Sequence, residues 1–241
     1  MALPAAQLKE SDRNFLGVER SLTGRAWRDR LDARGSALAL AIAQRHGLDE
    51  LLARVLAGRN VEVDNVEAFL DPTIKRLLPD PYTVTGMQAA SARIANAVIG
   101  GENAAIFGDY DVDGATAAAL LCRYLRLCGL DPIVHIPDRI FEGYGPNVDA
   151  IRSFAERGAR LLITIDCGVT SLEPLAEAQK LGLDAIVIYH HQADERLPDA
   201  VAIVDPNRAD DLSGLGHLAA VGLVFITLVA VTRELRKRNF W

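Results

Sequence analysis

Beyond residue 86 the chain alternates between short apolar runs and longer segments whose apolar residues have helical spacing. The runs predict strands at 104–107, 132–136, 161–165, 185–189 and 201–204. The longer segments predict helices at 89–99, 115–128, 148–157, 172–181 and 217–236. Runs such as LLITI at 161–165 are continuous and rich in β-branched residues, which is typical of strands buried on both faces. This alternation predicts an α/β fold in which a parallel sheet is flanked by helices.

The preceding part of the chain lacks this alternation. Residues 1 to about 35 are polar and carry scattered arginines, which predicts a loosely held extension. From 37 to 79 the apolar spacing is helical, and prolines interrupt it near its end. We therefore expect an N-terminal extension with a small helical lead-in at 1–85 and an α/β domain at 86–241. A chain of 241 residues is long enough for one full domain and a smaller one.

The stretch GDYDVDGAT, at 108–116, follows the first predicted strand and leads into a predicted helix. It gathers three carboxylates, Asp109, Asp111 and Asp113, within five residues. Like charges this close repel one another, and a divalent cation is a common reason for a fold to collect them. The stretch therefore indicates a metal site, although an acidic surface turn is the alternative because Asp and Gly are ordinary turn residues.

Other polar residues follow the later strands. Asp166 follows the strand at 161–165, His190 and His191 follow the strand at 185–189, and Asp205 follows the strand at 201–204. Ligands of open parallel sheets bind beyond the carboxyl ends of the strands, so we expect these side chains to converge on one site. Taken singly they have ordinary interpretations: Asp166 could cap the next helix, and the two histidines could be polar residues at the surface.

The stretch RIFEGYGPN, at 139–147, combines an arginine with two glycines around Tyr144. Glycines let the backbone approach a ligand closely, and Arg139 is suited to pairing with phosphate. A glycine-containing turn without a ligand is the alternative interpretation.

Composition leaves the substrate open. The net charge of −6 argues weakly against nucleic-acid binding, but cations held by carboxylates would invert the local field. The three cysteines are too few for a disulfide framework and suit a reducing cytoplasm. The apolar segment from Leu215 to Val231 is slightly short for a membrane span, so we expect a buried helix and no membrane partner.

The motifs together, in this order and each at a strand–helix junction, resemble the DHH phosphoesterase superfamily. They are GDYDVDG, then the arginine with EGYG, then IDCG at 165–168, then the His-His pair. FLDP and LPDP in the lead-in, DERLPDAVAIVDPN at 194–207 and GLGHLAAVGLVF at 214–225 are similar to the members of that superfamily that degrade single-stranded DNA. The resemblance covers nearly the whole chain and implies a Rossmann-like DHH domain.

The resemblance also implies roles for single residues. Metal-ligand positions are matched by Asp111, Asp113, Asp166 and His190. Catalytic positions are matched by Asp109, which lies near or in the metal shell, by His191, which contacts the scissile phosphate, and by Arg139. Arg139, Tyr144 and Asn147 match a motif that lines the substrate groove. Two ions of Mn²⁺ or Mg²⁺ are implied.

The implied activity is 5′-to-3′ exonuclease action on single-stranded DNA in repair and recombination, by two-metal hydrolysis that releases 5′-mononucleotides. A single-strand-binding protein or a helicase would be a fitting partner. The alternatives are a phosphodiesterase for short oligonucleotides or cyclic dinucleotides, a manganese pyrophosphatase, and a non-catalytic relative that binds single strands or acts as a scaffold.

Two features depart from the superfamily. Its signature is Asp-His-His, whereas this chain has Tyr189 before the histidines. The signature aspartate orients a histidine and adds negative charge, and a neutral tyrosine cannot supply that charge. We therefore expect impaired catalysis with weakened metal binding. The chain also stops after the last predicted helix, so it resembles an amino-terminal fragment that lacks a further Asp ligand and a second domain.

Overall fold

The computed structural model describes residues 14–194 and 196–241, so the first part of the predicted extension lies outside the described residues. The chain divides into two compact units, Met1–Leu78 and Pro79–Trp241. The sequence placed this division at 85/86. The difference arises because the short helix η4 (Pro81–Thr83) packs against helices of the second unit and so belongs to it.

The first unit is helical. Its described elements are η2 (Phe15–Gly17), α1 (Ala33–His46), α2 (Glu50–Ala57), η3 (Val63–Asn65), α3 (Val66–Leu70) and α4 (Ile74–Leu77). Asp32 and Asp49 cap α1 and α2 by accepting hydrogen bonds from backbone amides of the first turns. Ile42 of α1 and Leu56 of α2 are fully or almost fully buried in a small core between the two helices.

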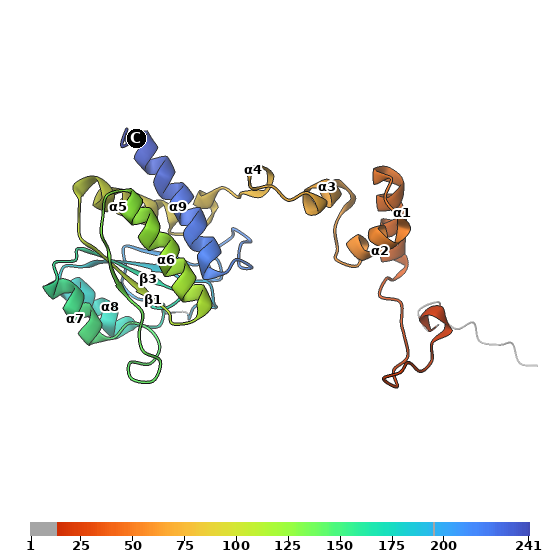
Figure 1. Cartoon of the computed structure of the whole chain (residues 1–241), viewed down its shortest axis with the longest axis horizontal. Helices are drawn as coiled ribbons and strands as arrows, with labels where there is room; N and C mark the ends of the chain where they lie inside the picture. The colour runs from red at the N-terminus through yellow and green to blue at the C-terminus, as the bar shows by residue number, and fades with distance from the viewer. Residues whose placement is uncertain (1–13, 195) are drawn as a thin grey trace, which may run out of the picture. The chain divides into compact units, whose positions relative to one another are not determined.

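The second unit is built on a five-stranded parallel sheet with the order β2-β1-β3-β4-β5. Figure 1 labels β1 and β3 in this sheet. The strands are β1 (Ala104–Gly108), β2 (Ile133–His135), β3 (Leu161–Ile165), β4 (Asp184–Ile188) and β5 (Ala202–Val204). All pairs are parallel, with Ile106 opposite Ile163 and Ile163 opposite Ile186. The predicted α/β fold is confirmed, and each of the five predicted strands is present within one or two residues of its predicted bounds.

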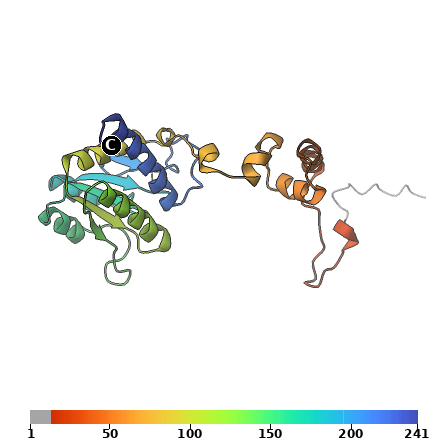
Figure 2. The same cartoon turned by 45° about the horizontal axis from the view of Figure 1, so that its top comes forward.

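Helices cover both faces of the sheet (Figures 1 and 2). α5 (Met87–Gly100), α6 (Val112–Leu127) and α9 (Ala220–Lys237) pack together on one face. α7 (Val148–Glu156) and α8 (Leu172–Lys180) pack together on the other face. Alternate strand residues such as Phe107 and Leu162 form a fully buried core with Phe154 of α7. Burial on both faces explains the continuous apolar strands.

Carboxylates of the acidic motif accept hydrogen bonds from the first turns of two helices, α6 and α9. α6 begins at Val112, earlier than the sequence predicted, because Asp111 accepts a hydrogen bond from Gly114 N (2.9 Å) as the N-cap. α9 begins at Ala220, later than predicted. Much of its length is buried against α5 and α6, and no helix among the described residues is long and apolar enough to cross a membrane.

Candidate metal and catalytic site

The residues that directly follow β1, β3, β4 and β5 lie in one row across the sheet. Backbone hydrogen bonds extend the parallel ladder to them, from Asp109 N to Ile165 O (3.1 Å), Asp166 N to Ile188 O (2.9 Å) and Tyr189 N to Val204 O (3.0 Å). The register of β4 and β5 places Asp205 beside Tyr189. This edge row (Asp109, Asp166, Tyr189 and Asp205) presents three carboxyl groups at the carboxyl end of the sheet, where ligands of such sheets bind.

The acidic motif makes a tight turn from β1 into α6. Gly114 is required there because a Cβ at this position would lie 2.6 Å from Asp109 Cβ. Asp113, in the first turn of α6, accepts hydrogen bonds from Ala220 N (2.7 Å) and Val221 N (2.9 Å) at the start of α9. Asp113 therefore ties the two helices together as well as facing the site.

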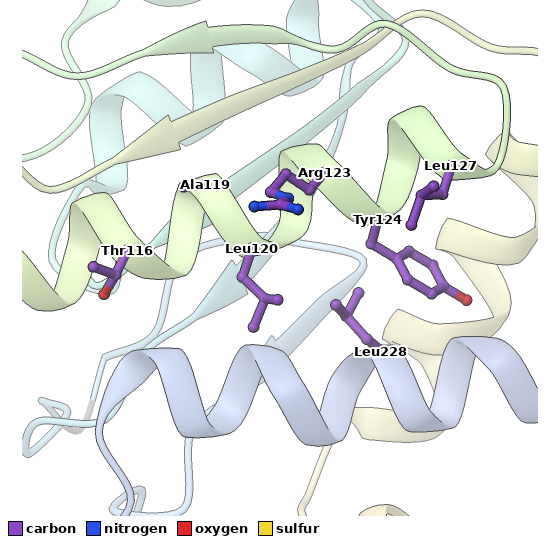
Figure 3. Close-up of a pocket in the computed structure, with 7 residues that line it drawn as sticks. All are labelled: Thr116, Ala119, Leu120, Arg123, Tyr124, Leu127 and Leu228. Carbon is purple, nitrogen blue, oxygen red and sulfur yellow. The ribbon is translucent and has the colours of Figure 1, made fainter.

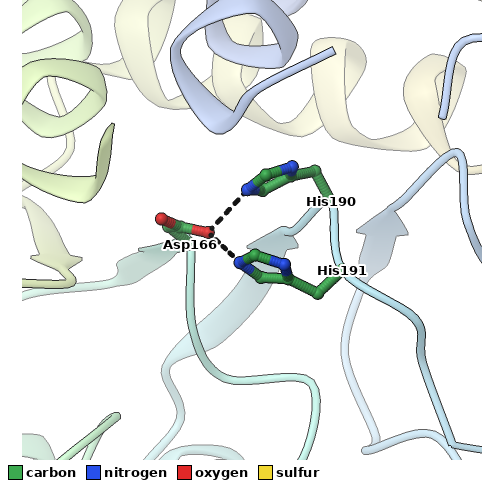
Figure 4. A group of neighbouring side chains, drawn as sticks. All are labelled: Asp166, His190 and His191. Carbon is green, nitrogen blue, oxygen red and sulfur yellow. Dashed lines mark ion pairs between the residues drawn. The ribbon is translucent and has the colours of Figure 1, made fainter. Parts of the chain in front are cut away.

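Asp166 and the two histidines form the centre of the site (Figure 4). His190 Nε2 lies 3.2 Å and His191 Nε2 lies 3.4 Å from Asp166 Oδ1. His190 Nε2 also lies 3.2 Å from Asp113 Oδ2. Asp166 has φ of +58°, a left-handed conformation that costs a non-glycine residue energy and is often retained at functional sites. The adjacent histidines, which the sequence left uncertain, both face the same carboxylate.

The buried carboxyl oxygens of the site lack protein donors. Asp109 Oδ1 and Asp166 Oδ1 are buried and have no hydrogen-bond partner among the described residues, and the two imidazoles meet Asp166 Oδ1 as ion-pair contacts. Burial, followed by the charges of nearby aspartates, raises the pKa of Asp166 from 3.8 to about 7. Burial also raises the pKa of Asp109, and burial with His191 nearby lowers the pKa of His190. A divalent cation would relieve the repulsion between the carboxylates and bind the neutral imidazole.

The ligand atoms fall into two overlapping groups. One oxygen or nitrogen from each of Asp109, Asp111 and Asp166 lies within 4.8 Å of the others, and the same holds for Asp166, His190 and His191. Asp166 is common to both groups, so the arrangement suits two ions that share one carboxylate. A set rich in carboxylates with some imidazole fits Mn²⁺ or Mg²⁺.

The loop after β2 lies at the same edge of the sheet. The Tyr144 hydroxyl donates to Asp166 O (2.9 Å), which attaches the loop to the metal site. The Arg139 guanidinium lies 5.2 Å from the centre of the Tyr110 ring, and its charge lowers the pKa of Asp109 against the effect of burial. The Arg139 charge therefore acts on the site carboxylate Asp109. The roles of Arg139 and Tyr144 remain predictions.

Asn147, predicted to line the substrate groove, is the N-cap of α7. Its Oδ1 accepts a hydrogen bond from Ala150 N (2.8 Å). We expect Asn147→Ala to lower the free energy of unfolding by about 1 kcal/mol, because the cap is lost. Asn147→Asp, which keeps the cap, should retain stability, as measured by urea denaturation. A stable Asn147→Ala variant with weakened DNA binding would instead support the predicted substrate role.

Tyr189 occupies the place of the signature aspartate. It is 8% exposed, and its ring packs in the core between the sheet and α7 and α8. The centre of its ring lies 5.3 Å from that of His191 in an edge contact. Tyr189 therefore fills space at the site and leaves its place in the edge row without a carboxyl group.

The sequence noted Asp205 and assigned it no role, and it did not single out Asn207. The structure places Asp205 next to Tyr189 in the edge row and Asn207 against the backbone of His190. Asp205 is fully buried, and the Asn207 side chain donates to His190 O. The signal available in the sequence was a strand-end aspartate followed by proline, which is also typical of ordinary turns.

A hollow of about 470 Å³ lies between α6 and α9 (Figure 3). Its lining is mainly apolar and consists of Thr116, Ala119, Leu120, Arg123, Tyr124, Leu127 and Leu228. None of these residues carries a carboxyl or imidazole group, so the hollow is not the metal site.

The DHH family, N-terminal domain, matches residues 103–239, which contain the whole edge row and both histidines. The chain belongs to the DHH family. The single-stranded-DNA-specific exonuclease RecJ of Bacillus subtilis is 40% identical over 156 residues, which are 65% of this chain and 20% of that protein. This member of the DHH family therefore spans about a fifth of the length of that relative.

Solved structures of RecJ share the fold of this DHH-family chain. RecJ from Thermus thermophilus in complex with Mn²⁺ has a TM-score of 0.66 at 26% identity, covering 83% of this chain and 27% of that one. An exonuclease RecJ bound to manganese has a TM-score of 0.58 at 32% identity, covering 63% of this chain and 38% of that one.

Proposed function

We propose that this chain is the metal-binding part of an exonuclease that degrades single-stranded DNA from the 5′ end and releases 5′-mononucleotides. The observation that carries the proposal is the pair of ligand groups that share Asp166, with buried carboxyl oxygens that lack protein donors. The likeness to RecJ proteins, two of them in structures with manganese, supports the substrate and the metal. A role in repair and recombination in the cytoplasm, beside a single-strand-binding protein or a helicase, accords with this substrate.

Five side chains would hold the metal ions: Asp109, Asp111, Asp113, Asp166 and His190. The ions would supply a water of lowered pKa and neutralise charge on the phosphodiester. Release of 5′-mononucleotides requires that a water oxygen bond to phosphorus while the bond from phosphorus to the 3′ oxygen breaks. The rigid edge row holds the carboxylates in place for this reaction, because backbone hydrogen bonds tie neighbouring strands together.

His191 and Arg139 are placed to contact the substrate. The His191 side chain is 58% exposed, against 19% for His190, so His191 can donate to a phosphate oxygen while His190 faces the carboxylates. Arg139 would stabilise the negative charge that grows on the phosphate in the transition state. Phe141, two residues after Arg139, is 86% exposed, and an exposed ring is suited to stacking on a nucleobase without reading sequence.

The proposal is tested with single-stranded DNA labelled at the 5′ or the 3′ end, incubated with the chain and Mn²⁺. We expect 5′-mononucleotides as the first products, and no cleavage of a blunt duplex or in excess chelator. Cleavage confined to oligomers of a few nucleotides would support the oligonucleotide phosphodiesterase, and hydrolysis of pyrophosphate would support the pyrophosphatase.

Tyr189→Asp is expected to raise activity about 10–100-fold per folded molecule, because it restores the charge beside the histidines. It also removes a ring from the core, so unfolding should become easier by a few kcal/mol, about 2–4. Product release at saturating Mn²⁺, corrected for the folded fraction by circular dichroism, measures the effect. Tyr189→Phe is the matched control and should not raise activity. Equal activity of the native chain and its Tyr189→Asp variant would mean that the tyrosine is tolerated.

A non-catalytic single-strand-binding protein is the second candidate, and Tyr189 is the observation that favours it. This candidate predicts DNA binding that is unchanged by chelator and by Asp166→Asn, with no cleavage at any Mn²⁺ concentration. The exonuclease predicts the opposite for both measurements, because the DNA phosphate would be held through the ions.

A further inference from the structure

Asp205 belongs to the edge row, yet the proposed function gives it no role. Its side chain is fully buried. Its Oδ1 accepts a hydrogen bond from Asn207 N (2.8 Å), while its Oδ2 has no partner among the described residues. A turn needs only the first oxygen, and leaving the second buried without a donor is costly. The burial of a whole carboxyl group here therefore points to a role beyond the turn.

The turn that Asp205 holds reaches the histidine pair through Asn207. The Asn207 amide donates to His190 O and to Gly216 O (3.0 Å), so it bridges the loop after β4 and the loop before α9. The fit is close, because a Cβ on Gly216 would overlap the Asn207 side chain. The backbone of His190 is thus held by a residue whose own position depends on Asp205.

The neighbour of Asp205 in the edge row is Tyr189. Tyrosine is neutral at physiological pH, and burial raises the pKa of Tyr189 further. Burial raises the pKa of Asp205 to about 6, while the hydrogen bond from Asn207 N and the charges of Arg208 and His191 act to lower it. The carboxyl group is therefore largely ionised at pH 7 and lies within electrostatic reach of the His191 imidazole. Tyr189 and Asp205 are neighbours in the edge row, and of these two residues only Asp205 can supply negative charge to the histidine pair.

We propose that Asp205 is the positioning carboxylate of the His190–His191 pair, and that it supplies from β5 part of the negative charge that the signature aspartate supplies in full from position 189. The inference rests on the proposed function in that the pair serves the metal site. Asp205 acts through the histidines: one oxygen holds the Asn207 turn, which contacts the His190 backbone, and the charge of the carboxyl group acts on His191. Such partners fix the orientation of imidazole ligands and raise their basicity.

A double-mutant cycle tests this replacement, with Mn²⁺ affinity measured by calorimetry. Asp205→Asn keeps an acceptor for Asn207 N and removes the charge, and it is expected to weaken Mn²⁺ binding about 10–100-fold. In a Tyr189→Asp background the same substitution should cost only about twofold, because the restored aspartate supplies the charge. The matched control is Asp199→Asn, because Asp199 is an exposed aspartate that precedes β5. This substitution should leave the Mn²⁺ affinity unchanged in both backgrounds. Equal losses in both backgrounds would overturn the inference.

Two further measurements keep the outcome clear. If the Tyr189→Asp chain does not fold, Asp205→Glu should bind Mn²⁺ more tightly than Asp205→Gln, and equal affinities would contradict a charged role.

If the native chain binds no Mn²⁺, the proposed function fails, and the imidazole ¹⁵N spectrum of the metal-free chain decides this inference alone. Asp205→Asn should shift the His191 signals, assigned with His191→Gln, while unchanged signals would show that Asp205 serves only the turn.

Discussion

Asp166→Asn is expected to reduce nuclease activity by about 10³-fold or more and to abolish binding of Mn²⁺ at micromolar concentrations. Asp166 is the residue common to both ligand groups, so its loss removes a ligand from each. The metal ions contribute several kcal/mol to stabilising charge in the transition state, and about 4 kcal/mol corresponds to a factor of about 10³. Single-turnover product release and calorimetry would measure the two effects.

Asparagine matches aspartate in size, so the fold should survive, and the circular dichroism spectrum of the variant should be that of the native chain. A matched control is Asp138→Asn, an exposed aspartate in the loop after β2 that belongs to neither ligand group. That variant should keep its Mn²⁺ affinity. If Asp166→Asn retained both Mn²⁺ binding and activity, the assignment of the metal site to the carboxyl edge of the sheet would be wrong.

The metal-free chain is expected to lose stability, relative to its Asp166→Asn variant, as the pH rises from 5 to 8. The pKa of Asp166 is about 7 in the folded chain and 3.8 as its ordinary value, so the folded state binds a proton that the unfolded state has released. The stabilisation is full below pH 3.8 and is lost as the pH rises through 7. The expected relative loss between pH 5 and 8 is on the order of 2 kcal/mol.

Urea denaturation of both chains in excess chelator, at pH 5 and at pH 8, would measure this difference. Other carboxylates titrate in the same way in both chains, so their contribution to the pH dependence of stability cancels in the comparison with Asp166→Asn. Saturating Mn²⁺ should reverse the trend for the native chain, because the ions bind the ionised carboxylates of the folded state. A difference between the two chains that does not change with pH would show that Asp166 titrates normally and that its burial is of little consequence.

The sequence predicted the elements of the second unit because its strands are buried on both faces and read as continuous β-branched runs. It misplaced the start of α9 because the cap of that helix comes from Asp113, a residue distant in the chain. It assigned Asn147 to the substrate groove, which stays a prediction, and it did not foresee that Asn147 Oδ1 caps α7. Asparagine before a helix is common both as a cap and as a ligand contact, so residue type and spacing could not reveal the cap.

The sequence by itself determined the α/β architecture, the acidic motif, the histidine pair and the departure at Tyr189, since each of these depends on residues close together in the chain. Only the tertiary structure decided that Asp109, Asp166, Tyr189 and Asp205 stand in one row, because that depends on the register between strands. The structure likewise showed that carboxyl oxygens in this row are buried without donors among the described residues. Burial and the distances between charges arise from packing of the whole unit, and they are what make this edge a site for cations.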